Sequence, residues 1–240
     1  MPPGATKGSP AEPKEVTLIL SYYENPRMLA RQLETIASYD AETRHFLRLI
    51  VVDDGSPEHP AAIEDCAVDF SLYRCLVDVP WNSDFCRNLA VSQASTEWVM
   101  LTDIDHLVPA KTAHAIVHKV HAPDVAHQFS RVSAPRLRPN EPHPNTYLLT
   151  RALFDAVGGY DERLSGFYGT DYDFRRRLRA RASIELLKNE VIRVPREVIA
   201  DASTTRYSRK TNPDRFMRTI RRDHMKEAPL RLTFPWEKVK

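Results

Sequence analysis

The 240-residue chain has few cysteines, and their pattern does not suggest cross-links. Cys66, Cys75 and Cys86 are odd in number and include no closely spaced pair, which argues against a disulfide framework or a cysteine-built zinc site. No apolar run approaches the roughly 20 residues of a membrane-spanning helix. Segment 1–14 lacks the hydrophobic stretch of a signal peptide. We therefore expect a cytoplasmic protein without an integral membrane segment, with a disordered leader over 1–14.

The chain also lacks a large net charge of either sign. Its formal charge is +2, and charged residues make up 28%, a usual share for a globular protein. Nine basic residues nevertheless fall within 206–231. Such a run is typical of a solvated helix face, or of a surface that contacts a membrane, another polyanion or ligand phosphates. Among the functional roles a diphosphate clamp is favoured, because Arg206, Arg209 and Lys210 follow Asp201 closely.

Short β-branched apolar runs alternate with helical periodicity through the first 120 residues. This alternation predicts an α/β fold, a mostly parallel sheet with helices on both faces. The expected strands and helices are, in order, a strand at 16–20, a helix from 26, strands at 47–52 and 72–77 with a helical stretch between them, a helix at 83–94 and a strand at 98–102. Later elements are a helix at 171–181, short strands near Ile184, Val191 and Val198, and a helix in the basic tail.

Two of the predicted strands end in paired acids. Asp53 and Asp54 follow the second strand, and Asp103 and Asp105 follow the last strand of the first half. Sheets of this kind bind ligands beyond the carboxyl ends of their strands. Residues two apart on an extended strand end point the same way, so Asp103 and Asp105 can face one ligand, and carboxylates suit Mg²⁺ or Mn²⁺. Each pair taken alone is better explained as a solvated turn.

A loop rich in glycine and aromatic residues leads into the predicted helix at Asp171. A carboxylate there can cap the helix. It is also held on a rigid element, where it could deprotonate an acceptor hydroxyl as a general base. The two roles are compatible.

The ordered set of motifs resembles the inverting family 2 glycosyltransferases of the GT-A fold. The resemblance is carried by residues 16–23, 51–56, 87–90, 103–105, 158–162 and 169–174. It implies a GT-A domain with a Rossmann-like nucleotide-binding sheet over 15–205, in which a nucleotide-sugar half spans about 15–110 and an acceptor half about 111–205. The second half of the chain is expected to form a C-terminal acceptor-side extension on the same sheet, followed by a basic C-terminal helix and tail over 206–240.

The resemblance also implies roles in donor binding. Ser21 and Asp54 would contact the nucleotide base, with Asp53 nearby. Arg87 would face the base or the diphosphate, and Asp103 the ribose or the metal. Arg206 is expected to help hold the donor.

The remaining implied roles concern the metal and the chemistry. Asp105 would be the main ligand of a Mn²⁺ or Mg²⁺ ion, and Asp171 the catalytic base. Asp173 is the fallback base, because this chain reads Thr-Asp where the family often reads Glu-Asp. Many GT-A enzymes draw a further metal ligand from the C-terminal part, and here Asp201 or His224 could serve.

The expected function is metal-dependent transfer of a hexosyl or N-acetylhexosaminyl group from a nucleotide-sugar, with UDP-sugar favoured, to an acceptor hydroxyl. The acceptor stays open among glycan, lipid, protein and nucleic acid. A nucleotidyltransferase is one alternative, but it would usually carry a glycine-rich phosphate loop, and residues 21–25 contain no glycine. A non-catalytic sugar- or nucleic-acid-binding module is another, although it would have no need to keep all the acids.

Overall fold

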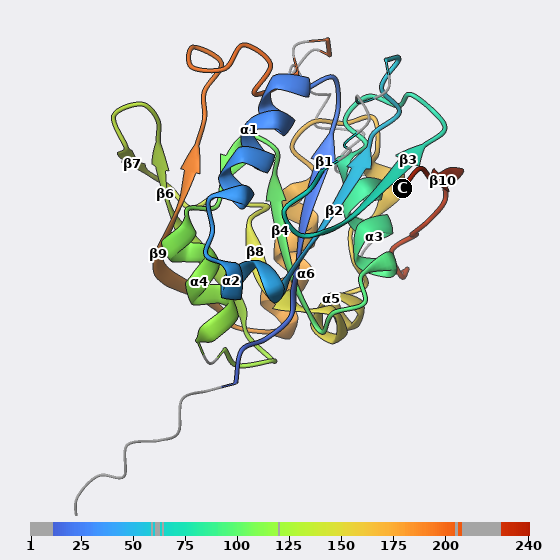
Figure 1. Cartoon of the computed structure of the whole chain (residues 1–240). Coiled ribbons are helices and arrows are strands. Elements are labelled where there is room, and N and C mark those ends of the chain that lie inside the picture. Colours follow the sequence, from blue (N-terminus) through green and yellow to red (C-terminus); the bar gives the residue numbers. More distant parts are fainter. Residues whose placement is uncertain are drawn as a thin grey trace, which may run out of the picture.

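The computed structural model describes residues 12–240 apart from 59, 61, 62, 64, 120, 205 and 208–226. These described residues form one ten-stranded sheet in the order β10-β3-β2-β1-β4-β8-β6-β9-β5, with β7 paired to β6 (Figure 1). The strands are β1 (Val16–Tyr22), β2 (Leu47–Asp53), β3 (Asp69–Cys75), β4 (Trp98–Asp103), β5 (His106–Leu107), β6 (Ala126–Ser133), β7 (Arg138–Asn140), β8 (Tyr147–Thr150), β9 (Ile184–Arg193) and β10 (Trp236–Lys238).

Strands β3, β2, β1 and β4 run parallel, and all four lie within residues 15–110. In the register of β1, Ser21 lies opposite Val52 of β2 and opposite Asp103 of β4. The carboxyl ends of three strands therefore reach the same level of the sheet. The prediction of a mostly parallel α/β sheet with helices is confirmed.

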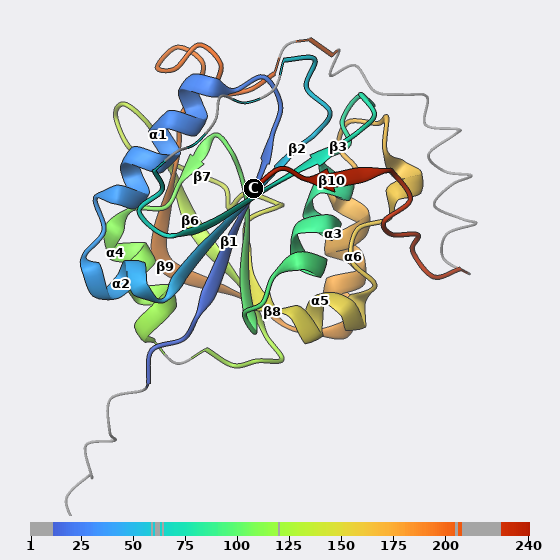
Figure 2. The ribbon, with the colours of Figure 1, turned by 45° about the vertical axis from the view of Figure 1, so that its right-hand side comes forward.

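Helices cover both faces of the sheet (Figure 2). They are α1 (Pro26–Ala37), α2 (Ala41–His45), α3 (Ser83–Gln93), α4 (Ala110–His118), α5 (Arg151–Val157), α6 (Asp171–Arg181) and a 3₁₀ helix over Glu162–Leu164. The side chains of β1 alternate between two cores, with Leu18 and Leu20 under α1 and α4, and Ile19 under α3. Burial on both faces explains why β1 is apolar without interruption. None of the helices described is long and apolar enough to span a membrane.

Three local predictions are wrong. The described residues between β2 and β3 contain no helix. The two short strands expected near Ile184 and Val191 are one strand, β9, and a bulge in its pairing with β6 at Phe129 and Ser130 breaks the alternation of side chains. Val198 lies in a turn instead of a strand, because its backbone N–H bonds to the carbonyl of Pro195.

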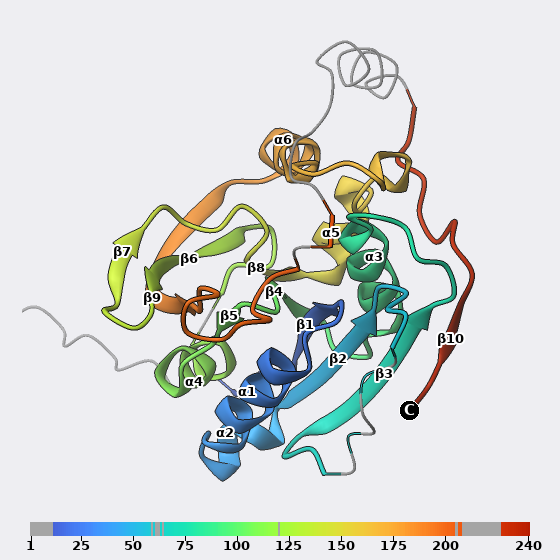
Figure 3. The ribbon, with the colours of Figure 1, turned by 90° about the horizontal axis from the view of Figure 1, so that it is seen from above.

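The C-terminal segment returns to the edge of the sheet, which the sequence did not predict. The helix expected over 213–226 of the basic tail, and residues 1–11 of the expected leader, lie outside the described residues. After residue 226 the chain is held by Glu162, which accepts hydrogen bonds from the backbone N–H groups of Leu232 and Thr233, each at 2.7 Å. The chain then forms β10, which pairs antiparallel with β3 (Figure 3).

Two buried histidines lie at the opposite end of the sheet from the strands' acidic ends. His121 and His127 are 6% and 3% exposed, and their rings lie 5.0 Å apart beside Trp98. Burial, followed by the neighbouring His127, lowers the pKa of His121 to about 4. The folded protein therefore holds this ring neutral at pH values where the unfolded chain protonates it.

We expect this burial to make the fold sensitive to acid. Below the ordinary histidine pKa of about 6.5 the unfolded state binds a proton at His121, whereas the folded state does not. The free energy of unfolding therefore falls as the pH drops towards about 4. Relative to His121→Gln, the wild type should lose up to about 1.4 kcal/mol of unfolding free energy per pH unit. Urea titrations at pH 7.5, 6 and 5 measure this difference. A stability difference for His121→Gln that does not vary with pH would contradict the prediction.

Candidate active site

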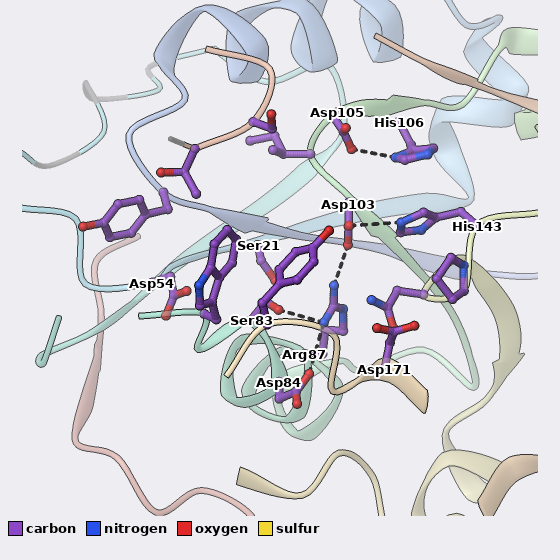
Figure 4. Close-up of a pocket in the computed structure, with 18 of the residues that line it drawn as sticks. Ser21, Asp54, Ser83, Asp84, Arg87, Asp103, Asp105, His106, His143 and Asp171 are labelled. Atoms are coloured by element: carbon purple, nitrogen blue, oxygen red, sulfur yellow. Dashed lines mark hydrogen bonds and ion pairs between the residues drawn. The ribbon is translucent and has the colours of Figure 1, made fainter. Parts of the chain in front are cut away.

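A cavity of about 450 Å³ opens beyond the carboxyl ends of the parallel strands. Its walls come from the ends of β1 and β4, the turn after β2, the first turns of α3 and α6, and the segment that follows β9 (Figure 4). The sequence predicted a ligand site at this edge. The structure places Ser21, Asp54, Arg87, Asp103, Asp105 and Asp171 together on the cavity wall.

At one end of the cavity Ser21 and Asp54 offer buried polar atoms. Ser21 Oγ and Asp54 Oδ1 have no hydrogen-bond partner among the described residues. Burial raises the pKa of Asp54 well above its usual value. Gly55 makes the turn that holds this carboxyl group, with φ of +74°, and a Cβ there would lie 2.3 Å from the carbonyl oxygen of Val77. Buried atoms of this kind are normally satisfied, so this end of the cavity is suited to a polar ligand.

Arg87 lies between two carboxylates near the centre of the site (Figure 4). Its guanidinium contacts Asp103 Oδ1 at 2.5 Å, Ser83 Oγ at 3.0 Å and Asp84 Oδ1 at 3.4 Å, and it packs 5.1 Å from the ring centre of Tyr160. The residue is 2% exposed. Because a buried arginine keeps its charge, it fixes a positive centre beside any anion that enters the cavity.

Asp103 and Asp105 line the cavity, although not on the extended strand end that was expected. Strand β4 ends at Asp103, and Asp105 lies in the turn before β5. Asp103 Oδ2 is 3.4 Å from His143 Nε2, and Asp105 Oδ1 is 2.6 Å from His106 Nδ1. Burial alone would raise the pKa of Asp103, but the nearby His143 and the charge of Arg87 outweigh it and hold the pKa below its usual range. Asp103 is therefore ionised.

The side chains around Asp103 and Asp105 suit a hard divalent cation only in part. No group of three or more His, Cys, Asp or Glu side chains in the described part of the chain is arranged to hold a metal ion. Mg²⁺ and similar ions, however, commonly bind through one or two carboxylates, and take their other ligands from water and substrate phosphates. Asp105, with Asp103 beside it, fits that mode.

Asp171 lies at the first turn of α6, on the other side of Arg87 from Asp54 in the close-up view (Figure 4). Burial raises the pKa of its carboxyl group, against the opposing charge of Arg87. The preceding residue, Thr170, donates a hydrogen bond of 2.8 Å from Oγ1 to Asp84 Oδ2. Asp84 is itself buried on α3, and burial raises its pKa to about 6. This contact ties the start of α6 to α3 and so fixes the position of Asp171.

Two of the expected site residues point elsewhere. Asp53 Oδ1 accepts a hydrogen bond from the backbone N–H of Ser56, and Oδ2 lies 3.7 Å from Arg74, so Asp53 shapes the turn after β2. Asp173 is buried against Arg176 and Arg177, at 3.1 and 2.8 Å. Neither residue lines the cavity.

The C-terminal candidates also differ from expectation. Both oxygens of Asp201 accept hydrogen bonds from the first turn of α1, at 2.7 Å from Arg27 N and 3.1 Å from Met28 N, which is a capping role. Arg206 is exposed and pairs with Glu24 at 3.1 Å. His224 lies outside the described residues. Neither Asp201 nor Arg206 is among the residues that line the cavity.

Several residues of the cavity were not found from the sequence. Asp84 could have been identified from the sequence, because it lies three residues before Arg87 in a predicted helix, a spacing that favours an ion pair. His143 comes from the proline-rich loop before β8, and Arg193 from the end of β9, and neither carries a local signal. Tyr207 closes one side, where its hydroxyl bonds to that of Tyr23 at 2.8 Å.

Comparisons with known proteins agree with this architecture. The family described as Glycosyl transferase family 2 matches residues 17–178. No match was found among curated proteins. Among solved structures, S. aureus TarS in complex with UDP-GlcNAc is similar, with a TM-score of 0.65 and 16% identity over 86% of this chain and 64% of that one.

Two further structures show the same fold. A mannosyltransferase from Pyrobaculum calidifontis, PcManGT, in complex with GDP-Man and Mn²⁺ has a TM-score of 0.56 and 20% identity, covering 85% of this chain and 61% of its own. GalNAc-T7 with UDP, GalNAc and Mn²⁺ has a TM-score of 0.59 and 11% identity, over 76% and 44%. The present chain thus spans less than two thirds of each of these three proteins.

Proposed function

Since the chain belongs to glycosyl transferase family 2, we propose that it transfers a sugar from a UDP-sugar to an acceptor hydroxyl, with inversion and with the help of a divalent cation. The observation that supports this most directly is the content of the cavity. One space contains two partnerless buried polar atoms at Ser21 and Asp54, a fixed positive charge at Arg87, the Asp103 and Asp105 carboxylates, and Asp171.

In this proposal the cavity is divided along its length. Ser21 and Asp54 bind the nucleotide base, where a serine hydroxyl and a carboxyl group can pair with the polar edge of a uracil. Arg87 binds the donor next to the diphosphate and, through its contact with Asp103, keeps that carboxylate in place. Asp105 and Asp103 would hold Mn²⁺ or Mg²⁺, which would neutralise the charge that develops on the departing diphosphate.

Asp171 carries the proton transfer. The acceptor oxygen forms a bond to the anomeric carbon, the bond from that carbon to the diphosphate oxygen breaks, and the hydroxyl proton moves to the Asp171 carboxylate. A single displacement of this kind inverts the anomeric centre and needs no nucleophilic side chain. The raised pKa of Asp171 improves it as a base, because proton transfer is most effective when the pKa of the base lies close to the working pH.

We expect nucleotide-sugars to stabilise the wild type in a metal-dependent way. At about 100 times its dissociation constant a ligand should add roughly 2.7 kcal/mol to the unfolding free energy. UDP-, GDP-, dTDP- and CMP-sugars, each with and without Mn²⁺, can be compared by thermal denaturation. Asp105→Ala should lose the metal-dependent part of the shift.

Asp201→Ala is the matched control for this experiment. Loss of the α1 cap should lower stability by about 1 kcal/mol and leave the ligand-induced shift unchanged. If Asp201→Ala instead abolished the metal-dependent shift, a capping role alone would not explain the result. Asp201 would then be assigned as a metal ligand. A wild type that no nucleotide stabilises would favour a non-catalytic binding module.

A further inference from the structure

Two arginines face the cavity from the strands on the far side of β4. Arg131 of β6 and Arg193 at the end of β9 both line the cavity. The strands pair in parallel, and Arg131 lies opposite Val191. Because side chains alternate along a strand, Arg193, two residues after Val191, projects from the same face of the sheet as Arg131. The two guanidinium groups are therefore neighbours on one wall.

Neither arginine forms a short ion pair with a carboxylate of the described residues. Arg131 forms no ion pair there, and its Nε is buried without a hydrogen-bond partner. Arg193 Nε is 3.9 Å from Asp105 Oδ2, at the outer limit of an ion pair, and Asp105 is already bonded to His106. Burial and the charge of Arg193 lower the pKa of Arg131, and they outweigh the carboxylates of Asp105, Glu141 and Asp103, which raise it. Placing two like charges side by side is unfavourable unless an anion lies between them.

The position of the pair separates it from the nucleotide. In the sheet order, β1 and β2 lie on one side of β4, whereas β8, β6 and β9 lie on the other. Ser21 and Asp54 come from the first side, and Asp103 and Asp105 follow β4 itself. A donor bound as proposed above would have its base on the first side and its diphosphate near β4. Arg131 and Arg193 would then face what lies beyond the diphosphate, namely the transferred sugar or the acceptor.

We propose that Arg131 and Arg193 form a second anion site, which binds a phosphate or carboxylate group other than the donor diphosphate. This inference rests on the proposed function. The planar guanidinium group makes paired hydrogen bonds to either type of anion. Arg136 and Arg138, exposed on the segment from β6 to β7, extend the positive charge outward from the cavity. Positive charge that continues to the surface favours an acidic acceptor, and an acidic donor sugar is the other source of the same chemistry.

The test titrates inorganic phosphate into the full chain by calorimetry, with and without saturating UDP and Mg²⁺. Wild type should bind phosphate in the presence of UDP. Arg131→Gln and Arg193→Gln should each weaken that binding at least about tenfold, the usual scale for a hydrogen-bonded ion, and leave UDP binding unchanged. Arg131→Lys should retain part of the affinity. Arg138→Gln, at an exposed position outside the cavity wall, is the charge-matched control and should bind phosphate as the wild type does.

A second titration identifies the source of the anion. If the donor sugar carries the acid, wild type should bind UDP-glucuronic acid at least about tenfold more tightly than UDP-glucose, and Arg131→Gln should lose the preference. Equal affinity for the two donors, together with phosphate binding that Arg131→Gln weakens, assigns the site to the acceptor. If Arg131→Gln does not fold, Arg193→Gln decides, because that side chain is 41% exposed.

Two results would overturn the second site. In the first, neither Arg131→Gln nor Arg193→Gln weakens phosphate binding, and the wild type does not prefer UDP-glucuronic acid to UDP-glucose. The other is a loss of UDP affinity equal to the loss of phosphate affinity, which would assign both arginines to the donor diphosphate. Failure of wild type to bind UDP is a different result. It would reject the proposed function, and the titration of phosphate without UDP would still decide whether Arg131 and Arg193 bind an anion.

Discussion

Asp171→Asn is expected to lower kcat for sugar transfer by about 10²–10⁴-fold and to leave donor binding unchanged. Asparagine has nearly the same shape but cannot accept the hydroxyl proton. The residue lies at the start of α6, and the bond from Thr170 to Asp84 that positions this turn does not involve the Asp171 side chain. Steady-state transfer rates at saturating donor, together with the UDP-induced thermal shift, separate chemistry from binding.

The fallback base provides the contrast. Asp173→Asn should reduce stability, because it breaks the buried contacts with Arg176 and Arg177, but the folded variant should transfer sugar at nearly the wild-type rate. The reverse pattern, with Asp171→Asn active and Asp173→Asn inactive, would show that the base had been assigned wrongly.

Arg87→Gln is expected to lower the free energy of unfolding by about 3–5 kcal/mol, the usual cost of removing one partner of a buried ion pair. The substitution leaves Asp84 without its cation and Asp103 with only His143. Many domains have a total stability of only about 5–15 kcal/mol, so the variant should be close to unfolding at moderate temperature. Urea denaturation followed by circular dichroism measures the loss.

The matched control is Arg31→Gln, which breaks an exposed pair with Glu34 on α1. A surface pair contributes at most about 1 kcal/mol, so this variant should unfold close to the wild-type urea concentration. Equal midpoints for Arg87→Gln and Arg31→Gln would mean that the central network does not stabilise the fold.

The first half of the fold could be predicted from the sequence because its signals are local. Strands β1, β2 and β4 are short apolar runs with buried neighbours on both faces, and α1 begins at Pro26 with apolar residues at helical spacing. The acids that follow these strands are visible without any structure. The order of the motifs along the chain then pointed to a family, which the comparison confirms.

Which acid of each pair enters the cavity could not be read in the same way. Asp53 ends β2 and Asp54 follows it, and adjacent residues on a strand face opposite sides. Asp171 and Asp173 are two residues apart on a helix, about 200° around its axis. In both cases only one of the two can face the ligand, and the choice depends on packing against distant elements. Asp201 shows the same limit, since its role depends on where α1 begins.

The placement of β10 has a consequence for how the molecule behaves among its own copies. Without it, β3 would be the outer strand on that side, with a row of unpaired backbone groups that can template pairing with another chain. Trp236 lies opposite Cys75 and packs on the ring of Tyr73, and the backbone N–H of Leu72 donates to the carbonyl of Lys240. β10 therefore replaces the end of β3 with an outer strand of only three residues, and short edge strands are one way in which proteins limit edge-to-edge pairing between copies.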